Sequence, residues 1–412
     1  MHPSCQEKAG LKEVIRFFAW LGLVSFGGPA GQISILREEL VERRRWLTPH
    51  EFSAGLNFSL LLPGPEAHQL VIYCGWKLHG LRGALAAGTL FVLPAVILML
   101  AAAALYAVYG QIDWVQTLLS TVRPAVLAII IAALVRMARH HLPDLRAWAV
   151  AAAAFVAMFF YQVPFPWIVL AALGIGAARH LRSPLPDNAP TPATAAIPWR
   201  TIALGLLAWW APVLLAVVIF GWDSLLASLG FFFSKVAVVT FGGAYAVLPY
   251  VADHAVQEAG WLSAGAMKDG LALAETLPGP LVKVLSFVGF LAGWNNASPL
   301  PPWAMGTLGA LITSWVTFVP SFLFILAGAP FVERWAGNPR ARTVLDTVTA
   351  AVIGVIAYLA AWFAAGVFAP DQPVLLHAVI AGVSLWLLVG RGWSIPAVLG
   401  VAAAAGLARA VL

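Results

Sequence analysis

The chain contains one unit written twice, and both copies carry the same helix-breaking residues. The string Phe26-Gly27-Gly28 recurs as Phe241-Gly242-Gly243, and Leu62-Pro63-Gly64-Pro65 recurs as Leu277-Pro278-Gly279-Pro280, both at one common offset along the chain. Glycine and proline interrupt helices, because glycine adopts non-helical backbone angles easily and proline lacks an amide donor. Two homologous halves built from interrupted helices are therefore predicted, an arrangement that membrane transporters use to form a site at the membrane midplane.

The register of the repeat shifts once. Leu119-x-Thr121-Val122 matches Leu345-x-Thr347-Val348 at a larger offset than the break strings, which places a short insertion around Gly293–Pro302. A proline-rich stretch without a hydrophobic run separates the two copies, as is typical of a linker. We divide the chain into a first repeat, a linker with a connecting transmembrane helix, and a second repeat, at residues 1–181, 182–221 and 222–412.

Composition places both halves in a membrane. Of the 412 residues, 61% are hydrophobic and only 10% are charged, which is too few charges for a soluble surface. Runs such as Gly83–Tyr109 and Thr201–Phe220 are long enough to cross a bilayer, and they lack the alternation of a β-barrel strand. We predict an all-α polytopic protein whose partner is the lipid bilayer. In a membrane protein the excess of lysine and arginine behind the net charge of +6 marks the loops that face the cytoplasm, so no nucleic-acid partner is expected.

Short segments flank the breaks. A helix of about fifteen residues spans roughly 22 Å, less than a hydrocarbon core of about 30 Å, so each half is predicted to hold two re-entrant or broken-helix hairpins, followed by about four transmembrane helices. The hairpin ends of the first half carry basic residues such as Arg43–Arg45, whereas those of the second half, Asp253–Gly260 and Gly293–Pro302, carry none. The positive-inside rule then predicts an inverted repeat with a cytoplasmic N-terminus. Full transmembrane spans in place of hairpins remain the alternative. They put Arg43–Arg45 on the opposite side of the membrane from Arg16, which the positive-inside rule disfavours.

The four breaks form the candidate substrate site. Each returning helix starts just after a break, so four N-termini can converge, and their free N–H groups and positive dipole ends favour an anion. Glycine allows a tetrahedral oxyanion to approach the backbone, although packing and kinking are the alternative role of these residues. The candidate residues of the breaks are Phe26, Gly27, Gly28, Pro63, Gly64, Pro65, Phe241, Gly242, Gly243, Pro278, Gly279 and Pro280.

Two repeat-equivalent basic residues lie just after the Pro-Gly-Pro strings. Lys283 follows Pro280 by three residues, and His68 occupies the matching position in the first copy. Both are predicted one turn into a returning helix, facing a shared centre, where they could neutralise a dianion or carry a proton. Snorkelling or pairing with a nearby acid is the alternative.

Other charged residues fall inside apolar segments. Glu66 and Glu275 flank the Pro-Gly-Pro breaks and are candidates for proton coupling, with helix capping as the alternative. Arg123 and Lys235 are further substrate-binding candidates. Their structural alternative is an ion pair with Asp346 or with one of the two glutamates.

No catalytic constellation is present in the sequence. It contains no histidine, cysteine and aspartate cluster with metal-ligand spacing, no phosphate-binding loop and no Gly-x-Ser-x-Gly string. We therefore predict that the protein is not an enzyme and uses no cofactor or metal. The pair His140-His141 is assigned to a solvated loop end, and Lys268 and Asp269 to local pairing.

The break strings, together with the basic segment through Trp46-Leu47, resemble the chromate ion transporter (CHR) family in its long two-domain form. The resemblance covers essentially the whole chain. It implies efflux of chromate across the bacterial inner membrane and chromate resistance, with sulfate as a related oxyanion, and it implies that the glycines of the breaks are functional. The copies differ after Phe-Gly-Gly, as Pro29-Ala30-Gly31 against Ala244-Tyr245-Ala246, so the site need not be symmetric.

We accordingly expect a secondary transporter that exports chromate. Moving two charges out of a negative interior gains about 4.6 kcal/mol per 100 mV, enough for a gradient of about a thousandfold, so voltage alone can drive export. The alternatives are a carrier for sulfate or another oxyanion, an anion channel, and a membrane scaffold or sensor without flux. Oligomeric state stays open, with a homodimer as one option.

Overall fold

The computed structural model describes residues 9–26, 28–181, 198–332 and 339–411, and every regular element within these ranges is a helix. Five of the described helices are long and apolar enough to cross a membrane: Glu66–Tyr109, Asp113–His141, Trp199–Phe220, Pro302–Gly328 and Thr343–Val367. Shorter apolar helices of 10–17 residues pack around them. The prediction of a polytopic α-helical membrane protein is confirmed.

The first half begins with short helices. They are α1 (Leu11–Val24), α2 (Gly28–Arg37) with its π-helical extension η1 (Glu38–Arg43), and α3 (Pro49–Leu61). A capping box starts α3. The hydroxyl of Thr48 accepts a hydrogen bond from the Glu51 amide at 3.2 Å, and the Glu51 carboxylate accepts one from the Thr48 amide at 2.9 Å.

The next helix, α4 (Glu66–Tyr109), folds back on itself. His79 and Gly80 have non-helical backbone angles, and Gly80 has a φ of 57°, which favours glycine. The segments before and after this turn pack so closely at Gly75 and Gly83 that a Cβ on either glycine would overlap the other backbone. The helical segment that starts at Glu66 therefore ends at this turn, and it is short, as predicted for segments next to the breaks.

The remaining helices repeat this order. The first half continues with α5 (Asp113–His141), α6 (Leu145–Tyr161) and α7 (Phe165–Leu181), and α8 (Trp199–Phe220) connects to the second half. The second half holds α9 (Leu225–Val239), α10 (Ala244–Asp253), η2 (His254–Glu258), α11 (Ala264–Thr276), η3 (Leu281–Lys283), α12 (Val284–Asn295), α13 (Pro302–Gly328), η4 (Ala329–Phe331), α15 (Pro339–Val367), α16 (Val374–Leu385), η5 (Trp386–Gly390) and α17 (Ile395–Val411).

Helix bounds follow the two offsets of the sequence repeat. The helix α3 maps onto α11 at the offset of the break strings, and α5 maps onto α15 at the larger offset, so the extra residues fall between α12 and α13. The π-helical extensions η1 and η2 also occupy matching places. The predicted linker runs through residues 182–197, which lie outside the described residues, so the division into 1–181, 182–221 and 222–412 stays a prediction.

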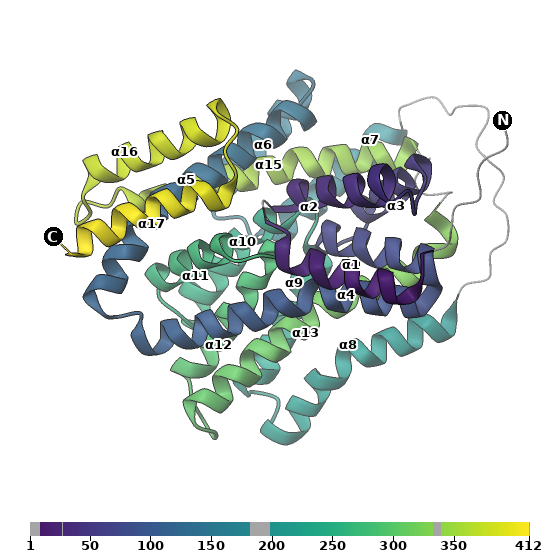
Figure 1. The fold of residues 1–412 in the computed structure, drawn as a ribbon, viewed down its shortest axis with the longest axis horizontal. Coiled ribbons are helices and arrows are strands. Elements are labelled where there is room, and N and C mark those ends of the chain that lie inside the picture. The colour runs from purple at the N-terminus through teal and green to yellow at the C-terminus, as the bar shows by residue number, and fades with distance from the viewer. Residues whose placement is uncertain (1–8, 27, 182–197, 333–338, 412) are drawn as a thin grey trace.

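The two halves interlock rather than forming separate lobes. α15 of the second half packs against α5, α6 and α7 of the first, and α16 and α17 pack against α5 (Figure 1). α12 and α13 pack against α4. By contrast, α8 lies at the rim of the molecule, where Leu207 and Val218 are 63% and 81% exposed, as expected for side chains that face lipid.

Candidate functional site

Hydrogen bonds between the halves join the four breaks in two pairs. The Gly279 amide donates to the Ser25 carbonyl at 2.7 Å, and the Gly64 amide donates to the Thr240 carbonyl at 2.7 Å. Ser25 and Thr240 are repeat equivalents, as are Gly64 and Gly279, so the two bonds are reciprocal. The first break of each half therefore lies beside the second break of the other half. The breaks thus lie together in two pairs, while the convergence of all four on one site stays a prediction.

Backbone geometry explains the glycines at these positions. The φ angles are 67° at Gly28, 124° at Gly64, 73° at Gly242, 95° at Gly243 and 98° at Gly279. All five lie in the left-handed region, where a Cβ is strained. The glycines are thus required by the chain path, whatever else they bind. Gly27 lies outside the described residues.

Helices return from three of the breaks as predicted, and the fourth differs. α2, α4 and α10 begin at Gly28, Glu66 and Ala244, directly after their breaks. After Pro280 the chain first forms the single 3₁₀ turn η3, and α12 begins only at Val284. A 3₁₀ turn is tighter than an α-helical one, so its first amides are directed differently. The anion-favouring helix ends are therefore three α-helical N-termini and one 3₁₀ turn.

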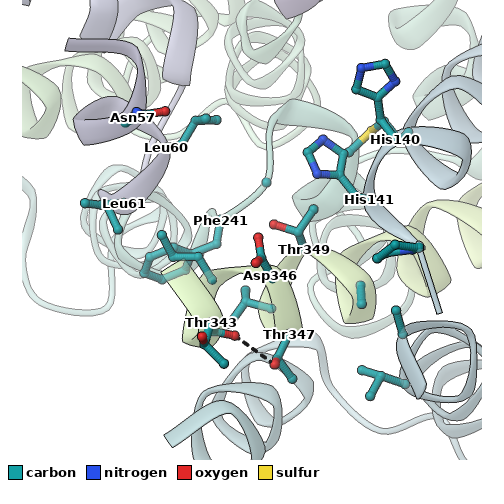
Figure 2. A pocket seen from close by; sticks show the side chains of 18 of the residues that line it. Asn57, Leu60, Leu61, His140, His141, Phe241, Thr343, Asp346, Thr347 and Thr349 are labelled. Carbon is teal, nitrogen blue, oxygen red and sulfur yellow. Dashed lines mark hydrogen bonds between the residues drawn. The ribbon is translucent and has the colours of Figure 1, made fainter. Parts of the chain in front are cut away.

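A cavity of about 820 Å³ reaches the second-half break. Its wall joins Phe241 and Gly242 at the break to the end of α5 and the start of α6. Figure 2 shows Asp346 and Thr349 of α15 directed into the space that faces Asn57 and Leu60 of α3. The polar lining residues are Ser53, Asn57, Glu66, His140, His141, Asp144, Thr343, Asp346, Thr347 and Thr349.

Sequence reasoning missed most of this cavity. His140 and His141 were assigned to a loop end, yet both line the wall, because α5 ends beside the first turns of α15. Thr343 and Thr347 were not considered. Their spacing of four residues puts two hydroxyl-bearing side chains on one face of a helix, and this is the signal that could have found them.

The Glu66 carboxylate lies at the inner part of this cavity. It is in the first turn of α4, and a Cβ on Gly243 would lie 3.3 Å from its Oε1 atom, so it also lies against the start of α10. Among the described residues, no basic side chain forms an ion pair with it. Two helix N-termini therefore flank one carboxylate, an arrangement that the helix dipoles favour.

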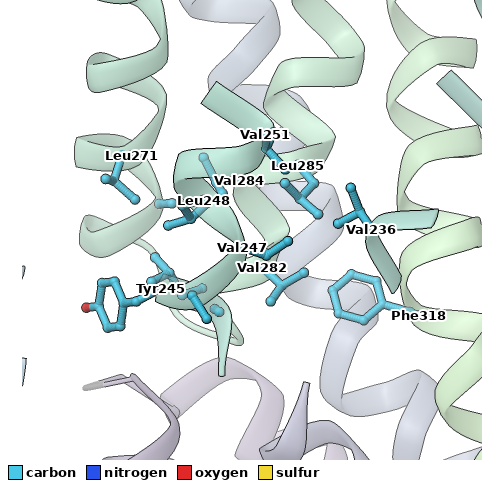
Figure 3. Close-up of a cluster of buried hydrophobic side chains, with 14 of the residues drawn as sticks. Val236, Tyr245, Val247, Leu248, Val251, Leu271, Val282, Val284, Leu285 and Phe318 are labelled. Atoms are coloured by element: carbon cyan, nitrogen blue, oxygen red, sulfur yellow. The ribbon is translucent and has the colours of Figure 1, made fainter. Parts of the chain in front are cut away.

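A buried polar chain lies at the second-half breaks. Tyr245 donates a 2.6 Å hydrogen bond to Glu275, and the Lys283 Nζ atom donates to the Gly279 carbonyl at 3.3 Å. Lys283 is 1% exposed, and Glu275 is the acidic group that interacts with it electrostatically. In Figure 3, Tyr245 belongs to the apolar cluster of α10, but its hydroxyl points away from that cluster. The lysine thus lies next to a break, as predicted.

His68 occupies very different surroundings from its equivalent, Lys283. It is fully buried, with its ring centroid 6.4 Å from Phe91, 5.4 Å from Phe318 and 5.3 Å from Phe322. Among the described residues, neither ring nitrogen has a hydrogen-bond partner of normal geometry, and the backbone of Gly88 offers only a weak contact. The two equivalent positions thus have unequal surroundings, because aromatic side chains from α4 and α13 enclose the histidine, and the expectation that both face one centre stays a prediction.

Arg123 has a different partner from those expected. Its guanidinium forms two bonds to Asp269 of α11, at 2.7 Å and 2.9 Å, and none to Asp346, Glu66 or Glu275. The reason is tertiary, since α11 packs directly against α5.

The two remaining lysines interact with aromatic rings. Lys268 does not join Asp269; its ammonium lies 4.7 Å from the ring centroid of Trp362. The exposed Lys235 lies 5.6 Å from the ring of Tyr250. Such contacts are cation–π interactions. Neither lysine lines the cavity.

Metal ligands do not gather in the part of the chain that the structure describes: no group of three or more histidine, cysteine, aspartate or glutamate residues could hold an ion. The described cysteine, Cys74, is buried and free. The polar groups that are brought together are hydroxyls, amides, carboxylates, two histidine rings and one buried lysine. These groups suit the binding and passage of an ion rather than bond-making chemistry.

Comparison with known proteins agrees with this chemistry. The chain is 36% identical over 349 residues to "Chromate transport protein" of Pseudomonas aeruginosa, covering 82% of this chain and 77% of that protein. It is 29% identical over 414 residues to "Probable chromate transport protein" of Synechococcus elongatus, covering 99% and 96%. The corresponding protein of Cupriavidus metallidurans is 28% identical over 366 residues, covering 84% and 80%. No solved structure matches.

The match to a protein family extends over both halves. Residues 12–177 and 227–407 each match the Chromate transporter family. Its named members are transport proteins, which agrees with the prediction that the chain is not an enzyme. The sequence resemblance is confirmed, and the chain belongs to the chromate transporter family.

Proposed function

We propose that the protein is a secondary transporter that exports chromate from the bacterial cytoplasm across the inner membrane and so confers chromate resistance. The observation that carries this proposal is the junction of the four breaks, joined by the Gly64–Thr240 and Gly279–Ser25 hydrogen bonds and reached by a cavity. The names of the relatives support chromate as the substrate.

The break junction supplies the groups that recognise a dianion. Free N–H groups at the starts of α2, α4 and α10 can donate to oxyanion oxygens, and the glycines allow close approach. Lys283 contributes a positive charge beside Gly279. The substrate site is thus the residues of the four break strings with Lys283, while His68 and Lys235 remain secondary candidates.

The route of transport follows from the reciprocal hydrogen bonds. An exchange that maps Ser25 onto Thr240 and Gly279 onto Gly64 is what a two-fold axis between the repeats produces, and the lack of basic residues at the hairpin ends of the second half favours an axis in the membrane plane, as in an inverted repeat. The cavity ends at His140, His141 and Asp144, in a segment that also carries Arg136, Arg139 and Arg146. Arginine-rich loops face the cytoplasm. The cavity is therefore the cytoplasmic entrance, and the N-terminus is on the same side.

Coupling to protons is assigned to Glu66, with Glu275 as the second candidate. The Glu66 carboxylate lies against the start of α10, where the oxyanion would bind. Two negative groups at one helix end repel each other, so substrate binding favours a protonated Glu66. Voltage alone still suffices for export, at about 4.6 kcal/mol per 100 mV for two charges.

Sulfate is the second candidate substrate. Backbone N–H groups respond to the shape and charge of an oxyanion, and chromate and sulfate are both tetrahedral dianions. The polar lining of hydroxyl and amide groups at Ser53, Asn57 and Thr349 contains nothing specific for chromium.

Purified protein in liposomes tests these assignments. We expect chromate to accumulate when the potential drives a dianion in the export direction, with competition from sulfate and molybdate ranking the substrates. Absence of flux for every oxyanion would overturn the transport function. A channel is distinguished by its reversal potential, because a coupled carrier shows fixed stoichiometry and a channel does not.

A further inference from the structure

An ion pair joins the two halves away from the cavity. Asp269 of α11 is 1% exposed and accepts both bonds from the Arg123 guanidinium of α5, whose side chain is 13% exposed. The Tyr106 hydroxyl of α4 donates to the same carboxylate at 2.9 Å. α11 also contacts α15, where Lys268 lies over Trp362. The α11 helix is therefore held against its neighbours by buried polar groups.

The equivalent place in the other half is open. In the alignment of the two copies, Asp269 and Lys268 of α11 correspond to Ala54 and Ser53 of α3, and Arg123 of α5 corresponds to Thr349 of α15. Ser53 and Thr349 both line the cavity. α11 thus packs closely on α5 through an ion pair, whereas α3 faces α15 across the cavity. The two halves therefore differ at this structural position.

We propose that the Arg123–Asp269 pair, completed by Tyr106, is a gate that closes the path from the break junction to the face opposite the cavity. This role rests on the transport function proposed above and gives Arg123 a use other than substrate binding. During transport the pair separates, α11 moves away from α5, and α3 closes on α15. The structure then represents the state that is open at the cavity and closed at the gate.

An ion pair between α11 and α5 suits this movement better than an apolar contact between them. When the gate is closed, Arg123 donates two hydrogen bonds to the Asp269 carboxylate, and the Tyr106 hydroxyl donates a third to the same carboxylate. When the gate opens, water enters and solvates the same charges, whereas a separated apolar contact would expose hydrophobic surface. The pair therefore permits two stable states, as alternating access requires.

Thiol labelling tests the gate without relying on flux. In a background that lacks Cys5 and Cys74, Thr349→Cys reports the cavity through its reaction with a membrane-impermeant maleimide added from the cytoplasmic side. Asp269→Asn should slow this labelling about tenfold, because the weakened gate shifts the population toward the cavity-closed state. Asp223→Asn, the same change at an exposed aspartate between α8 and α9, should leave the rate unchanged.

Further variants separate gating from folding. Arg123→Asp should act like Asp269→Asn, and the double variant Arg123→Asp/Asp269→Arg should restore labelling. Tyr106→Phe removes one hydrogen bond and should give a smaller shift in the same direction, so a folding failure of one variant leaves the test in place. Loss of transport with unchanged labelling in all variants would overturn the gate. Absence of flux in liposomes with a labelling shift would overturn the transport function instead.

Discussion

The Gly279 amide nitrogen lies 2.7 Å from the Ser25 carbonyl oxygen, and the repeat-equivalent Gly64 and Thr240 are joined at the same distance. Each break is thus hydrogen-bonded to a break of the other half. Duplication alone would give two similar halves. These reciprocal bonds, with one residue from each half in every pair, tie the breaks of the two halves together.

Substitution at Gly279 tests how strongly the junction depends on its backbone. Gly279→Ala places a Cβ at a φ of 98° and against Ala95, so we expect destabilisation of about 1–3 kcal/mol, together with loss of transport. Gly400→Ala is the control, since no atom lies within 4 Å of the added Cβ. Thermal unfolding in detergent measures the difference, and equal melting temperatures for the two variants would contradict the strain.

Lys283 provides the test of charge at the site. Lys283→Ala should abolish chromate transport with expression intact, because the positive charge beside Gly279 is lost. Lys12→Ala, at an exposed position of α1, should transport normally. Chromate uptake into inverted vesicles measures both variants. Unchanged uptake with Lys283→Ala would remove this lysine from the site.

Glu66 provides the test of proton coupling. Glu66→Gln keeps the size of the side chain and removes its charge, so chromate uptake should continue under a membrane potential but lose its response to a pH gradient. Glu42→Gln, which changes an exposed glutamate of η1, should retain the wild-type response. Vesicle uptake with the two gradients imposed separately is the measurement, and a pH response that survives Glu66→Gln would assign coupling elsewhere.

The capping box of α3 predicts a stability effect that is independent of transport. Thr48→Ala removes the hydroxyl that accepts the Glu51 amide, which should cost about 1 kcal/mol of unfolding free energy. The matched control is Thr117→Ala within α5, because the Thr117 hydroxyl donates a hydrogen bond to the Asp113 carbonyl and does not cap a helix. Comparison of the two melting temperatures checks this, and a larger loss in the control would be inconsistent with capping.

Glu39 predicts a pH dependence at the arginine-rich end of η1. Burial raises the pKa of its carboxyl, but hydrogen bonds from Arg43 and Arg44, at 2.8 Å and 3.0 Å, outweigh burial and hold the net pKa below its ordinary value. A depressed pKa stabilises the fold above the unfolded pKa of about 4.3, and this stability is lost as pH falls through the folded value. Melting temperature should therefore fall less steeply below pH 5 in Glu39→Gln than in the wild type. Identical acid profiles would exclude this contribution.

Part of the site was readable from residue type and spacing. The breaks at Gly28, Gly64, Gly242 and Gly279 were predicted because glycine and proline interrupt helices, and the positive φ of these four glycines agrees with this property of the residue itself. The matching offsets also predicted that the breaks recur in the second half. Lys283 was placed beside a break for the same local reason.

Pairing between side chains that are distant in the sequence could not be predicted from the sequence. Arg123 joins Asp269, 146 residues away, and His68 is enclosed by Phe318 and Phe322 of the other half. No periodicity of a single segment encodes such partners, because they depend on which helix faces which. The cavity wall was missed for the same reason, since α3, α5 and α15 contribute to it from separate parts of the chain.

The sequence by itself determined that this is a duplicated, helical membrane protein with interrupted helices, because hydrophobicity and helix-breaking act within each segment. Only the tertiary structure decided that equivalent residues have unequal surroundings. Ion pairs, aromatic enclosure and open space arise from contacts between segments. Two copies of one sequence pattern can therefore be closed at Asp269 and open at Ser53 in the same molecule.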